Sequence, residues 1–229
     1  EFLKNPPVGK DLLRWKYQRY VKEYCRTIRS VDEQVGRLLD YLEEKGVLDN
    51  TVIVYTSDQG FLLGEHGLYD KRFMYEESFR TPLIISCPSL VKKHSVCKEL
   101  VQNIDLAPTF LSLAGVEVPK EMSGRSLLPL FKNGKAENWR NELYYHFYDY
   151  PAVGSVRKHD GIRTKRYKLI HWYGEGSGND EAIDFWELYD LKKDVMEVNN
   201  VYDNPKYVKV REALTVQLEK LRKDVGVTE

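Results

Sequence analysis

Four side chains between residues 58 and 71 could bind a metal ion and an anion together. Asp58 and Gln59 follow a short run of β-forming residues, and His66 and Lys71 come next in a glycine-rich stretch. Carboxylate and amide oxygens favour calcium or magnesium over zinc. Lys71 is a compact cation with three donors and suits a sulfate or phosphate oxygen. His66 could donate to such an oxygen or protonate a leaving group.

Each of these residues also has a simpler interpretation. A polar Asp58-Gln59 pair before a glycine is common in turns that follow strands. Lys71 could be an exposed loop lysine, and His66 could be a hydrogen-bonding support. The residues flanking the pair favour the metal-site interpretation, because the candidate metal ligands, the lysine and the histidine occur together in one short block.

Arg80 follows a predicted short helix and precedes a Thr-Pro pair. We predict that its guanidinium braces the carboxylates of the metal site and does not touch the substrate. A buried arginine paired with Glu76 or Glu77 would look the same in sequence.

The elements around this segment alternate between helix and strand. Apolar residues recur at helical spacing in 12–45, in one or two helical pieces, and Gly46 is a plausible C-cap. The strand 51–55 contains Val-Ile-Val without polar alternation, so we expect helices on both of its faces. A short helix, a buried strand and a longer helix are predicted at 74–79, 83–86 and 105–113. This order is typical of a layered α/β fold.

The character of the sequence changes near residue 136. Aromatic-rich strand candidates follow at 143–148, 161–164, 167–172 and 186–191. An amphipathic helix is predicted over 206–223. We therefore expect two parts, with an α/β core that carries the Asp-Gln pair in 1–136 and a small antiparallel sheet with one helix in 137–229.

Composition narrows the class of function. The 229 residues are 42% hydrophobic and 31% charged, with a formal net charge of zero. The sequence contains no basic stripe that would point to nucleic acid and no apolar run long enough for a transmembrane helix. The odd number of cysteines, Cys25, Cys87 and Cys97, excludes complete internal pairing, so we expect buried or free thiols.

The block 51–82 resembles the second metal-binding motif of the type I sulfatases, which belong to the alkaline phosphatase superfamily. That motif joins a strand, an Asp-Asn, Asp-Gln or Asp-His pair, a Gly-x-x-Gly-like loop, a lysine and a Glu-x-x-x-Arg-x-Pro segment. The matching positions are 51–55, Asp58-Gln59, Gly64-Glu65-His66-Gly67, Lys71 and 76–82. Further segments similar to family signatures occur in the same order, at 30–36, 105–109, 124–127, 162–169 and 187–191.

The resemblance implies an α/β fold, with part of an alkaline-phosphatase-like mixed sheet flanked by helices and a small C-terminal antiparallel sheet with one helix. It implies that Asp58 and Gln59 hold a calcium ion, with magnesium less favoured, and that this ion also coordinates a sulfate ester. Lys71 would bind a sulfate oxygen, and His66 would lie beside it. The implied activity is metal-assisted hydrolysis of sulfate esters.

The nucleophile of that family is missing from this sequence. In the family it is a formylglycine made within a Cys/Ser-x-Pro-x-Arg motif of the N-terminal half. The nearest match, Cys25-Arg26-Thr27-Ile28-Arg29, has threonine in place of proline and lies in a predicted helix at the wrong point of the family order. The early Asp-Asp metal pair is missing too. We expect the C-terminal half of a sulfatase, inactive and prone to associate on its own, which an N-terminal sulfatase segment would complete into one continuous sheet.

The substrate side of the site is predicted in the second part of the chain. Arg157, Lys158 and His159 lie on a predicted loop beside a strand, and they could reach a sulfated, acidic sugar or form only a solvated basic turn. The segment is similar to that of bacterial sulfatases acting on the 6-O-sulfate of N-acetylglucosamine in heparan-type glycans. Family habit implies export, and the lack of a glycan-attachment sequon favours a bacterial periplasm.

Two other functions stay open. A phosphonate or phosphate ester hydrolase of the same superfamily would share the fold, although such enzymes usually place histidine where this chain has Gln59. A non-catalytic carbohydrate-binding remnant would explain the missing nucleophile, but it would not require Asp58, Gln59, His66 and Lys71 together.

Overall fold

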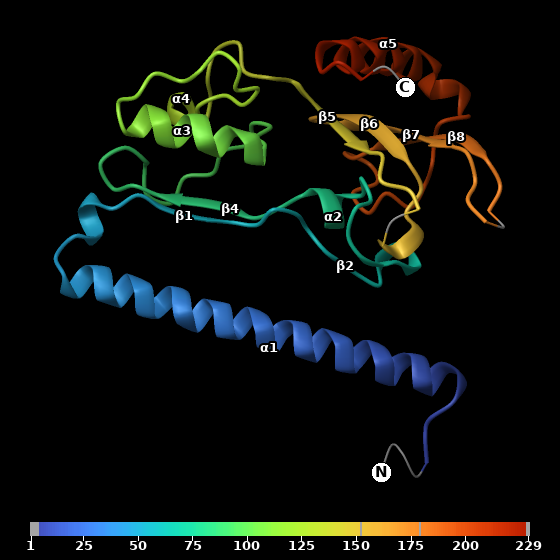
Figure 1. The fold of residues 1–229 in the computed structure, drawn as a ribbon, viewed down its shortest axis with the longest axis horizontal. Helices are drawn as coiled ribbons and strands as arrows, with labels where there is room; N and C mark the ends of the chain where they lie inside the picture. Colours follow the sequence, from blue (N-terminus) through green and yellow to red (C-terminus); the bar gives the residue numbers. More distant parts are fainter. Residues whose placement is uncertain (1–4, 152, 179, 228–229) are drawn as a thin grey trace.

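A computed structural model describes residues 5–151, 153–178 and 180–227. The chain forms two lobes side by side, with a long helix running beneath them (Figure 1). In chain order the helices and strands are α1 (Gly9–Glu44), β1 (Ile53–Thr56), β2 (Leu62–Leu63), β3 (Tyr69–Asp70), α2 (Glu76–Phe79), β4 (Leu83–Ser86), α3 (Leu106–Leu113), α4 (Leu128–Phe131), β5 (Glu142–Phe147), β6 (His159–Thr164), β7 (Tyr167–Gly174), β8 (Ile183–Asp190) and α5 (Val208–Asp224).

The first lobe is built on the antiparallel pair β1–β4, in which Ile53 lies opposite Ser86 and Thr56 opposite Leu83. Helices α3 and α4 cover one side of this pair, and α1 runs along the other (Figure 1). The core under α3 and α4 consists of Leu127, Leu130 and Phe131 with partly buried residues from β4 and α3 packed around them. The predicted helix 12–45 is a single helix, and Gly46 ends it with a φ of +67°.

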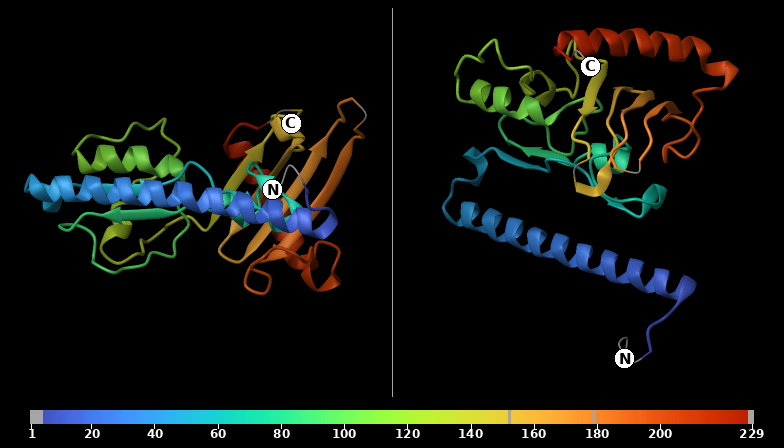
Figure 2. Two further views of the ribbon diagram at one scale, coloured as in Figure 1. Left: turned by 90° about the horizontal axis from the view of Figure 1, so that it is seen from below. Right: turned by 45° about the vertical axis from the view of Figure 1, so that its right-hand side comes forward.

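The expectation that helices cover both faces of the first strand is wrong for this chain. The side chain of Ile84 on β4 is 62% exposed, and α1 has no buried residue along its whole length. The accessible surface is 16018 Å², whereas a compact monomer of this mass exposes about 10,800 Å². Figure 2 shows α1 running lengthwise along the β1–β4 pair, on the side opposite α3. An apolar face of the first lobe therefore stays open.

The second lobe is the small antiparallel sheet with one helix that the sequence predicts. Its strands follow the order β5–β6–β7–β8, and every neighbouring pair is antiparallel. Helix α5 packs Leu214 and Leu218 against one face of the sheet. Arg222 of this helix forms two hydrogen bonds with Asp160 of β6, at 2.5 and 2.6 Å. The expected mixture of α/β layers and a C-terminal antiparallel sheet is confirmed.

The opposite face of this sheet packs against the segment that precedes and includes α2. Met74 and Tyr75 are buried against Ile170 and Trp172 of β7. Gly161 makes this approach possible, because a Cβ at this position would lie 2.6 Å from the Met74 sulfur and 2.4 Å from the Leu169 carbonyl oxygen. The C-terminal sheet therefore supports the chain segment that carries the candidate site.

A buried ion cluster joins the two lobes at this contact. The ammonium of Lys168 on β7 is fully buried, 2.6 Å from Glu197 and 2.9 Å from Glu76. It also donates to the carbonyl oxygen of Met74 at 2.6 Å. A Glu197 carboxylate oxygen accepts a hydrogen bond from the Glu76 backbone N–H, at the start of α2. These contacts connect β7 and the 190–200 loop to the first turn of α2.

The two carboxyls of the cluster respond differently to burial. Burial favours the neutral form of Glu76, but the charges of Lys168 and Arg163 outweigh it and hold the Glu76 pKa below its ordinary value. Burial raises the pKa of Glu197 despite the neighbouring Lys168.

No helix in the described residues is both long and apolar enough to cross a membrane.

Replacing Lys168 with methionine is expected to destabilise the protein by about 3–5 kcal/mol, because it leaves the buried Glu197 without a cation and removes one of the two cations that contact Glu76. Urea unfolding followed by circular dichroism measures this change. The matched control is Lys165→Met, since Lys165 is 48% exposed and pairs with Glu99 at the surface, a contact worth at most about 1 kcal/mol. Equal effects of the two substitutions would contradict a structural role for the buried cluster.

Candidate functional site

The loop after β1 carries the candidate metal ligands and is fastened to α2. The Gly60 N–H donates to the Ser78 carbonyl at 2.8 Å, and the Phe61 N–H donates to the Glu77 carbonyl at 2.6 Å. A Cβ at Gly60 would lie 2.0 Å from the Glu77 carbonyl oxygen, so only glycine fits at this point. The position of Asp58 and Gln59 is therefore set by the backbone of a helix that follows them in the chain.

The loop side chains leave oxygen atoms available. Asp58 is exposed and Gln59 is half-buried. The Ser57 hydroxyl contacts an Asp58 carboxylate oxygen at 3.3 Å and donates to the Gln59 carbonyl at 2.8 Å. Asn103 donates to the Asp58 carbonyl at 2.7 Å. These bonds hold the loop mainly through its backbone.

The oxygen-only donor set fits a hard divalent cation such as calcium. No group of three or more His, Cys, Asp or Glu side chains within the described residues could hold a metal by itself. The described residues therefore supply only part of a coordination sphere.

The short hairpin β2–β3 brings Lys71 back towards this loop. Leu62 pairs with Asp70, and Leu63 pairs with Tyr69. Continuing this antiparallel register leads Lys71 towards Phe61, next to Gly60. Lys71 is well separated from Asp58 in the sequence. The hairpin returns the backbone at Lys71 towards the loop that carries Asp58.

The backbone on either side of Lys71 is in an uncommon conformation. Asp70 has a φ of +76° and Arg72 a φ of +90°, values that non-glycine residues adopt only where neighbours fix them. Arg72 and Asp70 form an ion pair at 2.8 Å. The Tyr145 hydroxyl donates to the Arg72 carbonyl at 2.5 Å, and burial raises the Tyr145 pKa to about 12, which keeps this proton in place.

The Lys71 ammonium has no hydrogen bond or ion pair within residues 5–151, 153–178 and 180–227. Its side chain is half-buried. A half-buried cation held by a constrained backbone and lacking a counter-ion is suited to bind an anion.

His66 is fixed between an aromatic ring and a carboxylate. Its φ is +55°, and its ring stacks on Tyr75 with centroids 4.3 Å apart. Nε2 lies 3.5 Å from a Glu77 carboxylate oxygen, which is buried and has no hydrogen-bond partner among the described atoms. Because Glu77 also holds Phe61 through its carbonyl, α2 anchors both His66 and the Asp58 loop.

Arg80 is exposed. The alternative of a buried pair with a neighbouring glutamate is wrong, because Glu76 is engaged by Lys168 and Arg163. In the part of the chain that the structure describes, the Arg80 guanidinium forms no ion pair. Its predicted bracing of metal-site carboxylates stays a prediction, and those carboxylates would have to come from outside this part of the chain.

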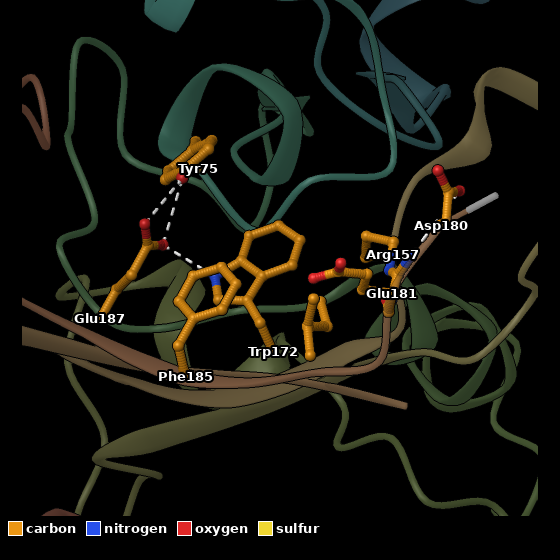
Figure 3. A pocket seen from close by; sticks show the side chains of 8 residues that line it. Tyr75, Arg157, Trp172, Asp180, Glu181, Phe185 and Glu187 are labelled. Atoms are coloured by element: carbon orange, nitrogen blue, oxygen red, sulfur yellow. Dashed lines mark hydrogen bonds and ion pairs between the residues drawn. The ribbon is translucent and has the colours of Figure 1, made fainter. Parts of the chain in front are cut away.

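The predicted sugar-binding residues lie at one end of the C-terminal sheet. The Arg157 guanidinium lies 4.6 Å from the centroid of the Tyr150 ring and donates to the Glu181 carbonyl at 2.5 Å. Lys158 is half-buried next to it. Arg157 is therefore already held by its own surroundings and faces the pocket drawn in Figure 3.

The expectation that His159 lies on an exposed turn is wrong. His159 begins β6, is 0% exposed, and stacks on Trp172 with ring centroids 4.1 Å apart. Its Nδ1 bonds to the Arg157 carbonyl at 2.9 Å, while Nε2 is buried without a partner in the described part of the chain. The alternating pattern of β6 turns this ring towards the sheet face that carries Trp172. A role in substrate binding stays a prediction for Arg157, Lys158 and His159.

Sequence reasoning missed three residues that shape the site, namely Glu77, Tyr75 and Lys168. Glu77 and Tyr75 were visible only as parts of a motif, and their contacts with His66 depend on tertiary structure. The position of Lys168 could have been predicted from the alternation of side chains along β7, which places it on the same sheet face as Ile170 and Trp172.

Comparison with known proteins identifies the class. Residues 64–224 match the family described as N-sulphoglucosamine sulphohydrolase, C-terminal, and residues 3–116 match the family described as Sulfatase. The chain therefore belongs to the sulfatases. Within them, most of its length belongs to the family of C-terminal regions named for N-sulphoglucosamine sulphohydrolase.

Individual relatives agree with this assignment. An N-acetylglucosamine-6-O-sulfatase of Bacteroides thetaiotaomicron is 51% identical over 225 residues, which are 97% of this chain and 39% of the relative. One solved structure shows a protein in complex with its substrate, D-glucosamine-2-N,6-O-disulfate. This chain matches it with a TM-score of 0.90 and 51% sequence identity, over 97% of this chain and 44% of that one.

A phosphonate monoester hydrolase of Agrobacterium radiobacter has a TM-score of 0.71 at 26% identity, over 86% of this chain and 40% of that one. The chain spans about two fifths of the length of the proteins it matches, as the shares of 39%, 44% and 40% show.

Replacing Gly60 with alanine is expected to destabilise the protein by about 3 kcal/mol, because the new methyl group overlaps the Glu77 carbonyl and forces the loop away from α2. Chemical unfolding measures the loss. Gly36→Ala in α1 is the matched control: a Cβ there meets nothing within 4 Å, and alanine should add about 0.5–1 kcal/mol of stability. A harmless Gly60→Ala would contradict the fastening of this loop to α2.

The free energy of unfolding should decrease as the pH is lowered, because of the buried His159. Burial lowers the pKa of His159 to about 4 from its ordinary value of 6.5. Below pH 6.5 the unfolded chain takes up this proton while the folded protein does not, so stability present above pH 6.5 is lost as the pH falls towards 4. The expected loss from this group is on the order of 3 kcal/mol.

His159→Phe should flatten the dependence between pH 6.5 and 4, as measured by urea midpoints across that range. His94→Gln, at an exposed position, should leave the dependence as it is. A wild-type profile that does not change when His159 is replaced would contradict the buried neutral imidazole.

Proposed function

We propose that the complete protein to which this chain contributes is a sulfatase that hydrolyses sulfate esters on glycans, with 6-O-sulfated N-acetylglucosamine as the favoured target. The observation that carries the proposal is that one short helix, α2, fastens both the loop with the two candidate oxygen ligands and the histidine, while the β2–β3 hairpin returns a constrained lysine towards that loop. The relatives named above support the substrate, because they are an N-acetylglucosamine-6-O-sulfatase and a protein solved with a sulfated glucosamine.

We assign the metal position to Asp58 and Gln59. Their oxygens suit Ca²⁺, and Mg²⁺ fits less well because it demands a stricter octahedral set of ligands. When bound, the ion would supply positive charge next to the sulfate group. The remaining ligands, and the formylglycine of the family, would come from an N-terminal sulfatase segment, because this sequence lacks the Cys/Ser-x-Pro-x-Arg motif.

Lys71 would bind a sulfate oxygen and oppose the negative charge that builds up during S–O cleavage. Among the described residues the Lys71 ammonium has no partner that an arriving anion would have to displace, and the constrained backbone holds the residue in place. His66, held by Tyr75 and Glu77, would donate a proton from Nδ1 towards the leaving oxygen. Glu77 supports that role by orienting the ring, because one of its carboxylate oxygens lies 3.5 Å from Nε2.

The remaining assignments follow from the same proposal. Of the three predicted sugar-binding residues, Lys158 would contact the acidic part of the sugar. Arg157, which Glu181 and Asp180 already engage, and the buried His159 would support the site from behind. We place the boundary between an α/β core at 1–136 and a C-terminal subdomain at 137–229 in the connection between β4 and β5. The glycan would be of the glycosaminoglycan type, and the protein would be exported to a bacterial periplasm.

The open apolar face of the first lobe supports the need for a companion segment. Helix α1 and Ile84 expose apolar side chains on the side of β1–β4 that α3 does not cover. Exposed apolar faces of this kind drive association. An N-terminal sulfatase segment would fill the space and extend β1–β4 into a larger sheet, and the chain by itself would be inactive.

The second candidate is a phosphonate or phosphate monoester hydrolase, which the structural likeness to such an enzyme favours. Gln59 argues against it, because those enzymes usually place histidine there and use transition metals. A third possibility, a carbohydrate-binding remnant without catalysis, would bind sugars but show no turnover. Metal analysis and assays on sulfate, phosphate and phosphonate esters separate the three.

In the complete protein, Lys71→Ala is expected to lower kcat on 6-O-sulfated N-acetylglucosamine by about 100-fold or more, since it removes one preorganised cation. Asp58→Ala should abolish calcium binding, as measured by elemental analysis after dialysis. The matched controls are Lys120→Ala and Asp49→Ala, both at exposed positions, which should stay within about twofold of the wild type, as expected for distant surface substitutions. Full activity of Lys71→Ala would refute the sulfate-binding role.

A further inference from the structure

A pocket of about 570 Å³ lies on the C-terminal sheet, outside the Asp58–Lys71 segment. Its walls come from the sheet face that carries Trp172, from Tyr75 in front of α2, and from the end of the sheet near Arg157 (Figure 3). The volume is within the range of about 300–1,000 Å³ that small-molecule sites occupy. None of the roles proposed above for the metal and sulfate site uses this space.

An aromatic wall with fixed geometry forms one side of the pocket. Trp172 and Phe185 lie on neighbouring strands and stack with ring centroids 5.8 Å apart and planes 12° apart. Trp172 is held from behind by His159, and its N–H donates to Glu187 at 2.9 Å. Phe185 is 46% exposed even though it is a large apolar side chain. A flat exposed ring on a rigid support offers a surface for the apolar face of a sugar ring.

Hydrogen-bond acceptors surround that wall. Glu187 is held in place by the hydroxyl of Tyr75, at 3.2 and 3.1 Å from its two carboxylate oxygens. Asp180 and Glu181 border the other end (Figure 3). Carboxylates are strong acceptors for hydroxyl donors. The lining therefore matches a ligand with one apolar face and several hydroxyl groups.

The charge of the pocket selects against anionic sugars. Three carboxylates line it against one guanidinium, and Arg157 is already engaged by the Glu181 carbonyl and by Asp180, 3.7 Å away. A sulfate or uronate in this space would meet like charges with no free cation in the lining. Like-charge contacts of this kind are an effective means of discrimination.

The pocket is close to the candidate sulfate site. Tyr75 lines the pocket, and the same ring stacks on His66 at 4.3 Å. The pocket and the candidate sulfate site therefore share Tyr75 and lie next to each other, as subsites for neighbouring units of one glycan would.

We propose that this pocket, lined by Tyr75, Trp172, Phe185 and Glu187, is a binding subsite for an uncharged sugar unit that flanks the sulfated one; the inference rests on the proposed function for its glycan context. The protein would then prefer a glycosaminoglycan in which the sulfated N-acetylglucosamine alternates with a neutral hexose, and not one in which it alternates with a uronate. The exposed Phe185 ring provides stacking and the buried Trp172 supports it, while Glu187, Asp180 and Glu181 accept hydrogen bonds from hydroxyl groups.

Calorimetric titration of the complete protein with N,N′-diacetylchitobiose tests the subsite without any turnover, because this neutral disaccharide carries no sulfate ester. Binding is expected in the wild type, and Phe185→Ala should weaken it about tenfold, as expected for the loss of one aromatic contact. The matched control is Phe110→Ala, because Phe110 on α3 is 47% exposed and lies outside the pocket. No binding by the wild type, or equal effects of the two substitutions, would overturn the proposal.

The charge argument has its own test. The double variant Asp180→Asn with Glu181→Gln should bind a fully sulfated heparin disaccharide at least several-fold more tightly than the wild type does. If the wild type already binds this disaccharide as well as chitobiose, and Phe185→Ala weakens both, the pocket accepts anionic sugars and the proposal is wrong.

Different results would refute the proposed function and the proposed subsite. Absence of sulfate-ester turnover by the wild type would refute the proposed function and leave the chitobiose result standing. Turnover without chitobiose binding would refute the subsite alone.

Discussion

The structure depends on keeping one buried ammonium group paired. Lys168 has no solvent contact and is neutralised by Glu76 and Glu197. Burying a charge is tolerable only with such partners, so β7 and the 190–200 loop have to meet the first turn of α2 in one arrangement. Because the carbonyls of α2 hold the Asp58 loop, this contact in the second lobe determines the geometry of the candidate site in the first.

The site is constrained at the backbone more than at the side chains. Gly60 lets the loop approach α2, and His66, Asp70 and Arg72 adopt left-handed conformations that their neighbours enforce. A chain held in this way keeps Lys71 in place without an ion pair to a carboxylate. The energetic cost of the unusual backbone is compatible with a site that must be ordered before an anion binds.

The uncovered apolar face of the first lobe is the second main feature of this chain. Helix α1 and the uncovered side of β1–β4 expose apolar groups that a folded protein normally covers. Two sulfatase relatives that match 97% of this chain are more than twice as long as it is. If the proposed function is right, a site shared between two parts of a fold accounts for two candidate metal ligands, a lysine and a histidine occurring here without a nucleophile motif.

The sequence by itself determined the elements and the family. Periodicity located α1, β4, α3, the four strands of the second sheet and α5, because their apolar patterns are local. The order of motifs around Asp58, Gln59 and Lys71 identified the sulfatase resemblance. The sequence did not determine that β1 would have an open face, because the Val-Ile-Val run of β1 is equally consistent with a covered strand.

Tertiary structure decided the remaining features, because they join residues far apart in the chain. The burial of His159, the cluster around Lys168 and the Tyr75 ring between His66 and Trp172 all depend on how the second sheet packs on α2. No local pattern encodes that contact.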